Sequence, residues 1–176
     1  MSGTAYSDSI YNYADKVTIN AKALDDYIFN SGTNISINGG SGYDSIENLG
    51  SKVTINGGAD DDTIHSEGNS VKIIADAGDD YISNQGNSVS IDSGDGNDYI
   101  DNMYGTDSVT IDAGAGNDYI SNSGKNVLLV SGAGNDSIYN NWSGSNVTFD
   151  SGAGNDSINN DGGNVSIDAG DGFRTC

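Results

Sequence analysis

Short apolar clusters recur along this chain at a fixed spacing, separated by polar residues. An isoleucine stands two residues after an aspartate at nine successive places. These aspartates are Asp8, Asp26, Asp44, Asp62, Asp80, Asp98, Asp118, Asp136 and Asp156. Successive members are 18 residues apart except at two steps of 20, where the extra pair falls between the isoleucine and the next valine. A period this regular predicts stacked structural repeats and excludes a disordered acidic tail.

Each repeat contains a second apolar cluster, a pair with one polar residue between its members, such as Val89 and Ile91. This alternation is typical of a strand. One turn between the clusters is rich in Gly and Asp, and the other reads Asn-x-Gly. A strand has no partner inside its own repeat, so it must pair with the same strand of the next repeat. We therefore predict an all-β parallel solenoid of about nine coils with two short strands each, a single array over residues 1–176, roughly 40 Å long.

An asparagine column follows the isoleucines. It stands two residues after each one, with Ser66 in the single gap. Its members are Asn12, Asn30, Asn48, Asn84, Asn102, Asn122, Asn140 and Asn160. Stacked amide side chains can hydrogen-bond from coil to coil. Asparagine also tolerates left-handed turn geometry, which is the alternative explanation.

The charge of the chain limits its partners. There are 26 acidic residues against 6 basic ones, for a net charge of −20. Phosphate backbones and anionic membrane surfaces would be repelled. No apolar run is long enough to span a bilayer. The single cysteine, Cys176, cannot form an internal disulfide.

Nearly all of the acidic residues are aspartate, which suits tight sites built from oxygen ligands. The acidic turn is most regular at residues 93–98 (SGDGND), 113–118 (AGAGND), 131–136 (SGAGND) and 151–156 (SGAGND). Its paired glycines are Gly94 and Gly96, Gly114 and Gly116, Gly132 and Gly134, and Gly152 and Gly154. Glycine permits a tight loop with carbonyl groups turned inward, and the aspartate adds carboxylate oxygens. Several hard oxygen ligands, some from the backbone, suit Ca²⁺ better than Zn²⁺, copper or Mg²⁺.

At these loops the chain resembles the repeats-in-toxin (RTX) family, whose nonapeptide reads Gly-Gly-x-Gly-x-Asp-x-apolar-x. Residues 113–121 (AGAGNDYIS) match it except for alanine at the first glycine. The resemblance covers nearly the whole chain and implies a right-handed β-roll, with several Ca²⁺ ions between stacked loops. It implies as ligands the loop carbonyls and Asp98, Asp118, Asp136 and Asp156, with Asp44, Asp62 and Asp80 in loops that match less closely.

The chain departs from the family pattern in three places. The second half of each repeat has an apolar residue such as Val127 where the family has its aspartate, so we expect metal along one edge only. The first loops, 3–8 and 21–26, lack the glycine pattern. Arg174 replaces the last expected aspartate.

The resemblance implies a Ca²⁺-binding structural module of a secreted or cell-surface protein that folds outside the cell. Because both ends of the chain fall inside repeats, we expect a piece of a longer array. His65 has no nucleophile or second histidine near it in sequence, so we do not expect an enzyme. An adhesive or carbohydrate-binding surface is the alternative. Tyr27, Tyr81, Tyr99 and Tyr119 would form an outward stripe that either binds sugar or reflects strand propensity alone.

Two further surfaces follow from the repeat. The two insertions should carry Met103, Tyr104 and Trp142 outward at the asparagine edge. An outward column of Ser and Thr would suit an ice-binding face, although Lys72 and Leu128 interrupt it. Open ends of parallel coils would also allow self-association.

Overall fold

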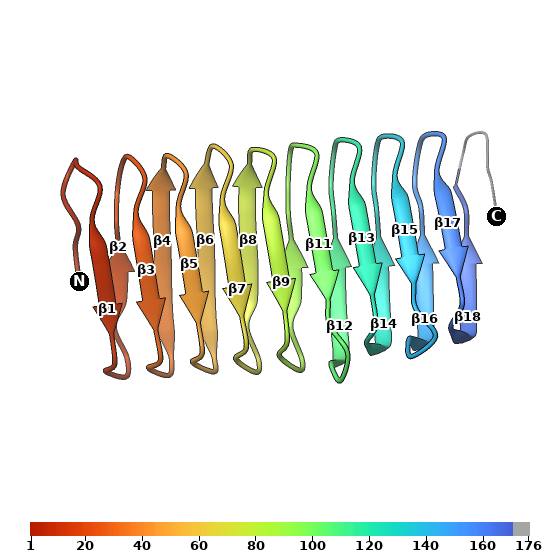
Figure 1. Ribbon diagram of the computed structural model, residues 1–176, viewed down its shortest axis with the longest axis horizontal. Helices are drawn as coiled ribbons and strands as arrows, with labels where there is room; N and C mark the ends of the chain where they lie inside the picture. The colour runs from red at the N-terminus through yellow and green to blue at the C-terminus, as the bar shows by residue number, and fades with distance from the viewer. Residues whose placement is uncertain (171–176) are drawn as a thin grey trace.

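The computed structural model describes residues 1–170 and confirms the parallel β-solenoid (Figure 1). Nine coils stack along one axis, and no helix occurs within those residues. One sheet contains β1 (Ser9–Asn12), β3 (Tyr27–Asn30), β5 (Ser45–Asn48), β7 (Thr63–Ser66), β9 (Tyr81–Asn84), β11 (Tyr99–Asn102), β13 (Tyr119–Asn122), β15 (Ser137–Asn140) and β17 (Ser157–Asn160). The other contains β2 (Thr18–Asn20), β4 (Ile35–Ser41), β6 (Val53–Ala59), β8 (Lys72–Ala77), β10 (Ser90–Asp92), β12 (Asp107–Asp112), β14 (Lys125–Val130), β16 (Ser145–Asp150) and β18 (Gly163–Asp168). We call them the odd sheet and the even sheet.

Every strand pairs in parallel with the same strand of the neighbouring coil, so equivalent residues lie on top of one another. Ile82, Ile100 and Ile120 are successive partners in the odd sheet, across one 18-residue step and one 20-residue step. The insertions therefore leave the register unchanged. They are absorbed in the turns between β11 and β12 and between β15 and β16, on the lower edge in Figure 1.

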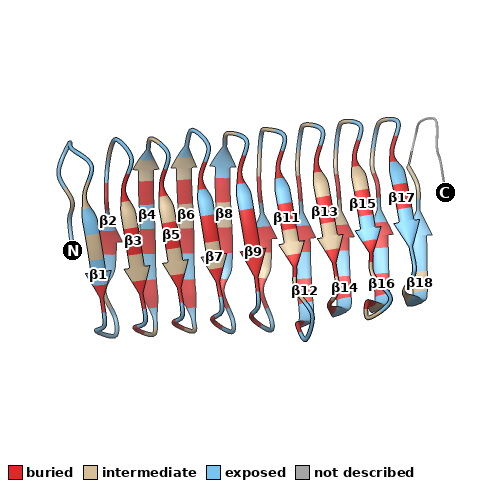
Figure 2. Cartoon of the chain, viewed as in Figure 1, coloured by how far each residue is buried: buried red, intermediate tan, exposed pale blue. Residues whose placement is uncertain are grey.

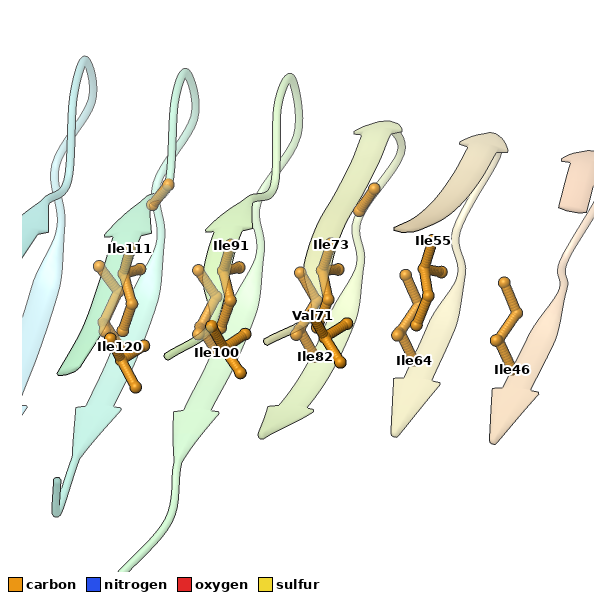
Figure 3. Packing of buried hydrophobic residues seen from close by; sticks show 14 of the residues in the cluster. Ile46, Ile55, Ile64, Val71, Ile73, Ile82, Ile91, Ile100, Ile111 and Ile120 are labelled. Carbon is orange, nitrogen blue, oxygen red and sulfur yellow. The ribbon is translucent and has the colours of Figure 1, made fainter. Parts of the chain in front are cut away.

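The core is a single layer of side chains between the two sheets. Inward isoleucines from both sheets meet there, and most are 0–1% exposed (Figures 2 and 3). Val127 is 2% exposed and belongs to the core, as expected from its place in the repeat. Burial falls off at the two ends of the array, where Ile10 and Val165 are only partly buried and Ile167 is 42% exposed.

The two outer faces carry different chemistry. The outer column of the even sheet holds, in register, Thr18, Ser36, Thr54, Lys72, Ser90, Thr110, Leu128, Thr148 and Ser166. The odd sheet instead carries aromatic rings, including Tyr81, Tyr99 and Tyr119 as successive outward partners. Both outward columns are where the repeat pattern predicts them.

The upper edge consists of the loops that lead from the even to the odd strands (Figure 1). Each loop between residues 21 and 156 places two residues in the left-handed region, and from residue 94 onward all of them are glycines. In the earlier loops Lys22, Leu24, Asp60 and Asp76 take this conformation, with φ between 66° and 94°. Left-handed backbone is costly for such side chains, so the loops with a residue other than glycine at a left-handed position are the strained ones.

The lower edge contains the asparagine ladder. The Nδ2 of Asn102 donates to Oδ1 of Asn122 at 2.8 Å, and Asn122 donates in the same way to Asn140 at 2.8 Å. None of the ladder asparagines has a positive φ, because that geometry falls on a later position such as Asn126. Hydrogen bonding between coils, rather than turn tolerance, therefore explains the column. At the gap, Asn48 donates to the Ser66 hydroxyl at 3.2 Å.

Replacing Gly116 by alanine should destabilise the fold by at least ~2 kcal/mol. A Cβ there would lie 1.6 Å from the Gly96 carbonyl oxygen, at a φ of 140°. Gly163 is the matched control, because a Cβ there meets nothing within 4 Å and its backbone needs no positive φ. Gly163→Ala should stay within about 0.5 kcal/mol of the parent chain in denaturant unfolding. Equal midpoints for the two variants would contradict the close approach of neighbouring loops.

Asn122→Ala should also destabilise the fold, by about 2–3 kcal/mol. The Asn122 side chain is buried, donates to Gly124 and Asn140, and accepts from Gly124 and Asn102. The reverse change, Ser66→Asn, should stabilise the fold by about 1 kcal/mol, because it completes the ladder. Asparagine fills this position in all of the remaining coils. Chemical unfolding of both variants tests the ladder, and a destabilising Ser66→Asn would count against it.

Candidate metal centre

A column of aspartates runs along the inside of the upper edge. Each stands where a loop enters an odd strand, and each is at most 3% exposed. The buried members are Asp26, Asp44, Asp62, Asp80, Asp98, Asp118, Asp136 and Asp156. Stacking of identical coils therefore places every predicted aspartate ligand, and Asp26 as well, in the same environment.

One carboxylate oxygen of each aspartate is fixed by the neighbouring coil. The backbone N–H of Asp98 donates to Oδ1 of Asp118 at 2.9 Å, and that of Asp118 donates to Oδ1 of Asp136 at 2.9 Å. The same bond occurs at every step from Asp8 to Asp156. The aspartate column is thus a second ladder between coils, this time from backbone to side chain.

The second oxygen, Oδ2, is buried at all eight positions and has no partner within hydrogen-bond geometry. The nearby Ser93 and Ser131 hydroxyls oppose the rise in the pKa of Asp98 and Asp136, but they donate to backbone carbonyls. The Oδ2 atom faces the inner side of its own loop, since a Cβ on Gly39 would lie 2.3 Å from Oδ2 of Asp44 and one on Gly57 2.3 Å from Oδ2 of Asp62. A buried carboxylate oxygen without a partner is costly. Each position therefore needs a proton or a cation.

Burial raises the pKa of most of these carboxyl groups. It takes the pKa of Asp62 from 3.8 to about 8, that of Asp80 and Asp118 to about 7, and that of Asp44 to about 6. Loss of water is the main cause, and adjacent carboxyl groups add to it, while the N–H bond from the neighbouring coil opposes it. In the folded chain these aspartates ionise readily only when a positive charge lies beside them.

The loop carbonyls divide into two sets. Those of Gly94, Gly114 and Gly132 accept backbone N–H groups of the next coil, each at 2.8 Å. Those of Gly96, Gly116 and Gly134 accept no hydrogen bond within residues 1–170, and they lie against the glycine of the following loop. The second set leaves carbonyl oxygens between the coils that could bind a metal. For Gly152 and Gly154, the residues of the next coil that correspond to these partners, from position 171 on, are outside the described part of the chain.

These oxygens fit a cation only as a mixed set. Among residues 1–170, no three His, Cys, Asp or Glu side chains converge closely enough to hold a metal by themselves. Any metal here would need one or two carboxylates together with backbone carbonyls, which is the donor set that Ca²⁺ accepts most readily. The replacement of the last expected aspartate by Arg174 also lies outside the described part of the chain.

The outer aspartates next to the loops have mixed roles. Oδ1 of Asp150 accepts the N–H of Gly152 at 3.1 Å, and Oδ1 of Asp168 accepts that of Gly170 at 3.2 Å. These two cap the turns. Asp92 and Asp112 face each other across β10 and β12 as like charges, which is unfavourable for the sheet.

Sequence reasoning did not assign Asp26 to the site, although its Asp-x-Ile register places it there. It also missed the buried serine hydroxyls at the start of several loops. Ser93 donates to the Ala113 carbonyl at 2.9 Å, and Ser131 to the Ser151 carbonyl at 2.9 Å. The signal is a column of Gly, Ala and Ser five residues before each aspartate.

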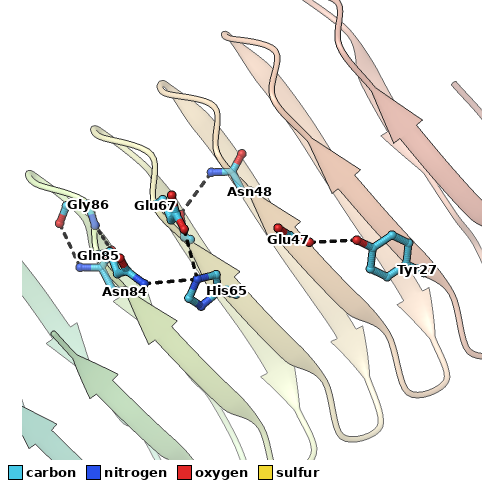
Figure 4. Close-up of polar contacts among 9 residues, drawn as sticks. Tyr27, Glu47, Asn48, His65, Glu67, Asn84, Gln85 and Gly86 are labelled. Atoms are coloured by element: carbon cyan, nitrogen blue, oxygen red, sulfur yellow. Dashed lines mark hydrogen bonds and ion pairs between the residues drawn. The ribbon is translucent and has the colours of Figure 1, made fainter.

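The single histidine lies away from this column, on the outer face of the odd sheet (Figure 4). Its Nε2 is 3.7 Å from Oε1 of Glu67 and 3.4 Å from Nε2 of Gln85. Beside it, the Tyr27 hydroxyl donates to Glu47 at 2.9 Å. The contacts with Gln85 and between Tyr27 and Glu47 join neighbouring coils, that with Glu67 lies within one coil, and His65 has the outward position that the repeat predicts.

The pKa shifts predict an unusual pH dependence for the metal-free fold. The pKa of these carboxyls is higher in the folded chain than in the unfolded one, so the fold takes up protons as the pH falls from about 8 to about 5, and this stabilises it. In excess chelator, the folded fraction of the chain, followed by far-ultraviolet circular dichroism, should rise as the pH falls over this range. Asp62→Asn should reduce the rise, since it removes the group of highest pKa. A folded fraction that falls on acidification would contradict the buried column.

Comparison of the chain with protein-family models, with curated proteins and with solved structures finds no match. No helix long and apolar enough to cross a membrane occurs among residues 1–170. The likeness of the loops to the RTX nonapeptide is therefore a resemblance in the residues of this chain alone.

Proposed function

We propose that this chain is a Ca²⁺-binding structural repeat module of a secreted or cell-surface protein, whose folding is completed by Ca²⁺ outside the cell. The observation that carries the proposal is the column of eight buried aspartates, each with an unpartnered Oδ2 atom. The column lies at one edge only, because the corresponding positions of the other edge hold Val127 and its equivalents in the core.

The residues that would hold the metal come from consecutive loops. Asp98, Asp118, Asp136 and Asp156 would supply carboxylate oxygens. The carbonyls of Gly96, Gly116 and Gly134 lie between the same coils without a hydrogen bond. Bound Ca²⁺ would supply positive charge and tie neighbouring loops together. Exclusively oxygen donors make Zn²⁺ and copper poor alternatives, and flexible loops do not favour the rigid octahedron of Mg²⁺.

Electrostatics explain why folding should depend on the ion. Neighbouring carboxylates one coil apart, about 4.8 Å, repel by ~1 kcal/mol in water and by more in a medium of lower dielectric constant. Eight such groups in a row bring the sum to the size of the whole stability of an ordinary domain, about 5–15 kcal/mol. A cation that binds only the folded state reverses this balance by mass action.

The C-terminal loops should bind first. Their left-handed positions are all glycine, so these loops can adjust around an ion without strain. In the N-terminal half, Lys22, Leu24, Asp60 and Asp76 occupy those positions and hold the loops in costly conformations. The gaps between loops 93–98, 113–118, 131–136 and 151–156 are therefore the preferred sites.

A Ca²⁺ titration followed by far-ultraviolet circular dichroism tests the proposal. At neutral pH the chain should be largely disordered in excess chelator and β-rich in millimolar Ca²⁺, with a melting temperature that climbs with the Ca²⁺ concentration. Equal β content and the same melting temperature in chelator and in Ca²⁺ would overturn it. The protein would then be a solenoid that folds without metal.

The site residues are tested by Asp118→Asn with Asp112→Asn as the control. Each variant replaces one aspartate by asparagine in the same coil. Asp118 is 2% exposed, whereas Asp112 is an exposed residue of β12. Isothermal titration with Ca²⁺ should show fewer ions bound, or at least tenfold weaker binding, for Asp118→Asn only. If both variants keep the stoichiometry and affinity of the parent chain, the interior column is not the binding site.

A further inference from the structure

The two insertions in the repeat bring two exposed aromatic rings together. Tyr104 lies in the turn between β11 and β12, and Trp142 in the turn between β15 and β16. These residues are 38 positions apart and are separated by a whole coil, whose own turn is not lengthened. Their ring centroids are nevertheless 6.3 Å apart, with the planes tilted by 32°. Both insertions thus contribute one ring each to a single aromatic pair on the lower edge.

Both residues are largely exposed to solvent. Tyr104 is 75% exposed and Trp142 79%. In the tyrosine stripe of the odd sheet, Tyr81, Tyr99 and Tyr119 stack with centroids 5.1 and 4.9 Å apart and planes within 13° of parallel. Each of those rings covers its neighbour's face, so the stripe presents mainly ring edges. Contact with the flat face of a ligand is therefore available at the lower edge rather than on the stripe.

Hydrogen bonds hold the two turns in place. The backbone N–H of Thr106 and its hydroxyl both donate to the Met103 carbonyl, and the N–H of Gly144 donates to Asn141. The amide of Asn141 and the hydroxyl of Ser143 bond to Ser123, in the short turn of the intervening coil, at 2.8 and 3.0 Å. The second insertion is therefore hydrogen-bonded to the coil that separates the two rings. Because the turns are held in place, little conformational entropy is lost when the rings bind a ligand.

Polar groups line the same edge. The amide of Asn126 donates to Asp107 at 2.7 Å, and that of Asn146 donates to Asn126 at 3.0 Å, so the exposed side chains form a row across three coils. Lys125 stands beside them in the intervening coil. Amide and carboxylate groups beside an aromatic surface suit a ligand with an apolar face and a rim of hydroxyl groups.

We propose that Tyr104 and Trp142 form a binding site for a neutral oligosaccharide. The C–H face of a pyranose ring would pack on the aromatic rings, and its hydroxyl groups would bond to the amide and carboxylate row. Two adjacent rings match two consecutive sugar units better than a single monosaccharide. The net charge of −20 favours neutral over acidic sugars. This site is separate from the aspartate column, on the opposite edge of the solenoid.

Trp142 is the only tryptophan, so its fluorescence reports directly on the site. The full chain in Ca²⁺ would be titrated with hexasaccharides of neutral β-linked and α-linked glucose, xylose, mannose and N-acetylglucosamine, and with oligogalacturonate as the acidic counterpart. At least one neutral hexasaccharide should give a saturable shift in emission, with a dissociation constant of about 1 mM or tighter. Oligogalacturonate should bind at least tenfold more weakly.

Affinity electrophoresis in gels containing the matching polysaccharide extends the test to variants without tryptophan. Trp142→Ala and Tyr104→Ala should each weaken retention at least tenfold. Tyr6→Ala should not, since Tyr6 is also 75% exposed but belongs to the first upper loop. Circular dichroism of the same samples separates the two proposals, because a β-rich chain that binds none of the neutral hexasaccharides overturns only this one. Equal retention of all three variants, or tighter binding of the acidic sugar, would overturn it as well.

Discussion

In-register stacking of coils is the constraint on which the rest of this structure depends. Each strand pairs with its own equivalent in the next coil, so every position lies directly above and below the same position. An interaction that is favourable between two identical side chains is then repeated along the whole array. Isoleucine packing and the asparagine ladder benefit from this repetition, and the fold becomes a sum of nearly equal increments.

The same repetition multiplies any unfavourable interaction. Aspartates at the entrance to the odd strands are buried one above another, and the backbone N–H of the neighbouring coil satisfies only Oδ1. Because no arginine, lysine or histidine side chain forms an ion pair with these carboxylates within residues 1–170, the charge has to be compensated by protons or by an external cation. The glycines that let the loops approach so closely also leave carbonyl oxygens between them, which connects the geometry of the loops to the proposed Ca²⁺ site.

Departures from the repeat are where individual residues can acquire a role of their own. The insertions keep the register of both sheets because they lie in turns on the lower edge, outside the ladders. They add no strand pairing, so their side chains are not constrained by an equivalent neighbour. Tyr104 and Trp142 lie in these insertions and contact each other. Tyr99 lies in a paired strand and is stacked between Tyr81 and Tyr119.

The sequence by itself determined the architecture of this protein, because an 18-residue period with two strand-like clusters leaves only one way to pair them. It determined the inward positions of Val127 and the isoleucines and the column of aspartates for the same reason. Only the tertiary structure decided between the two explanations of the asparagines, since φ and hydrogen bonds belong to particular residues and not to a pattern. Only the tertiary structure showed that Oδ1 is bonded and Oδ2 is not, and that Tyr104 meets Trp142 across a coil. Those facts depend on how far apart neighbouring coils place their atoms, and spacing along the chain does not specify that distance.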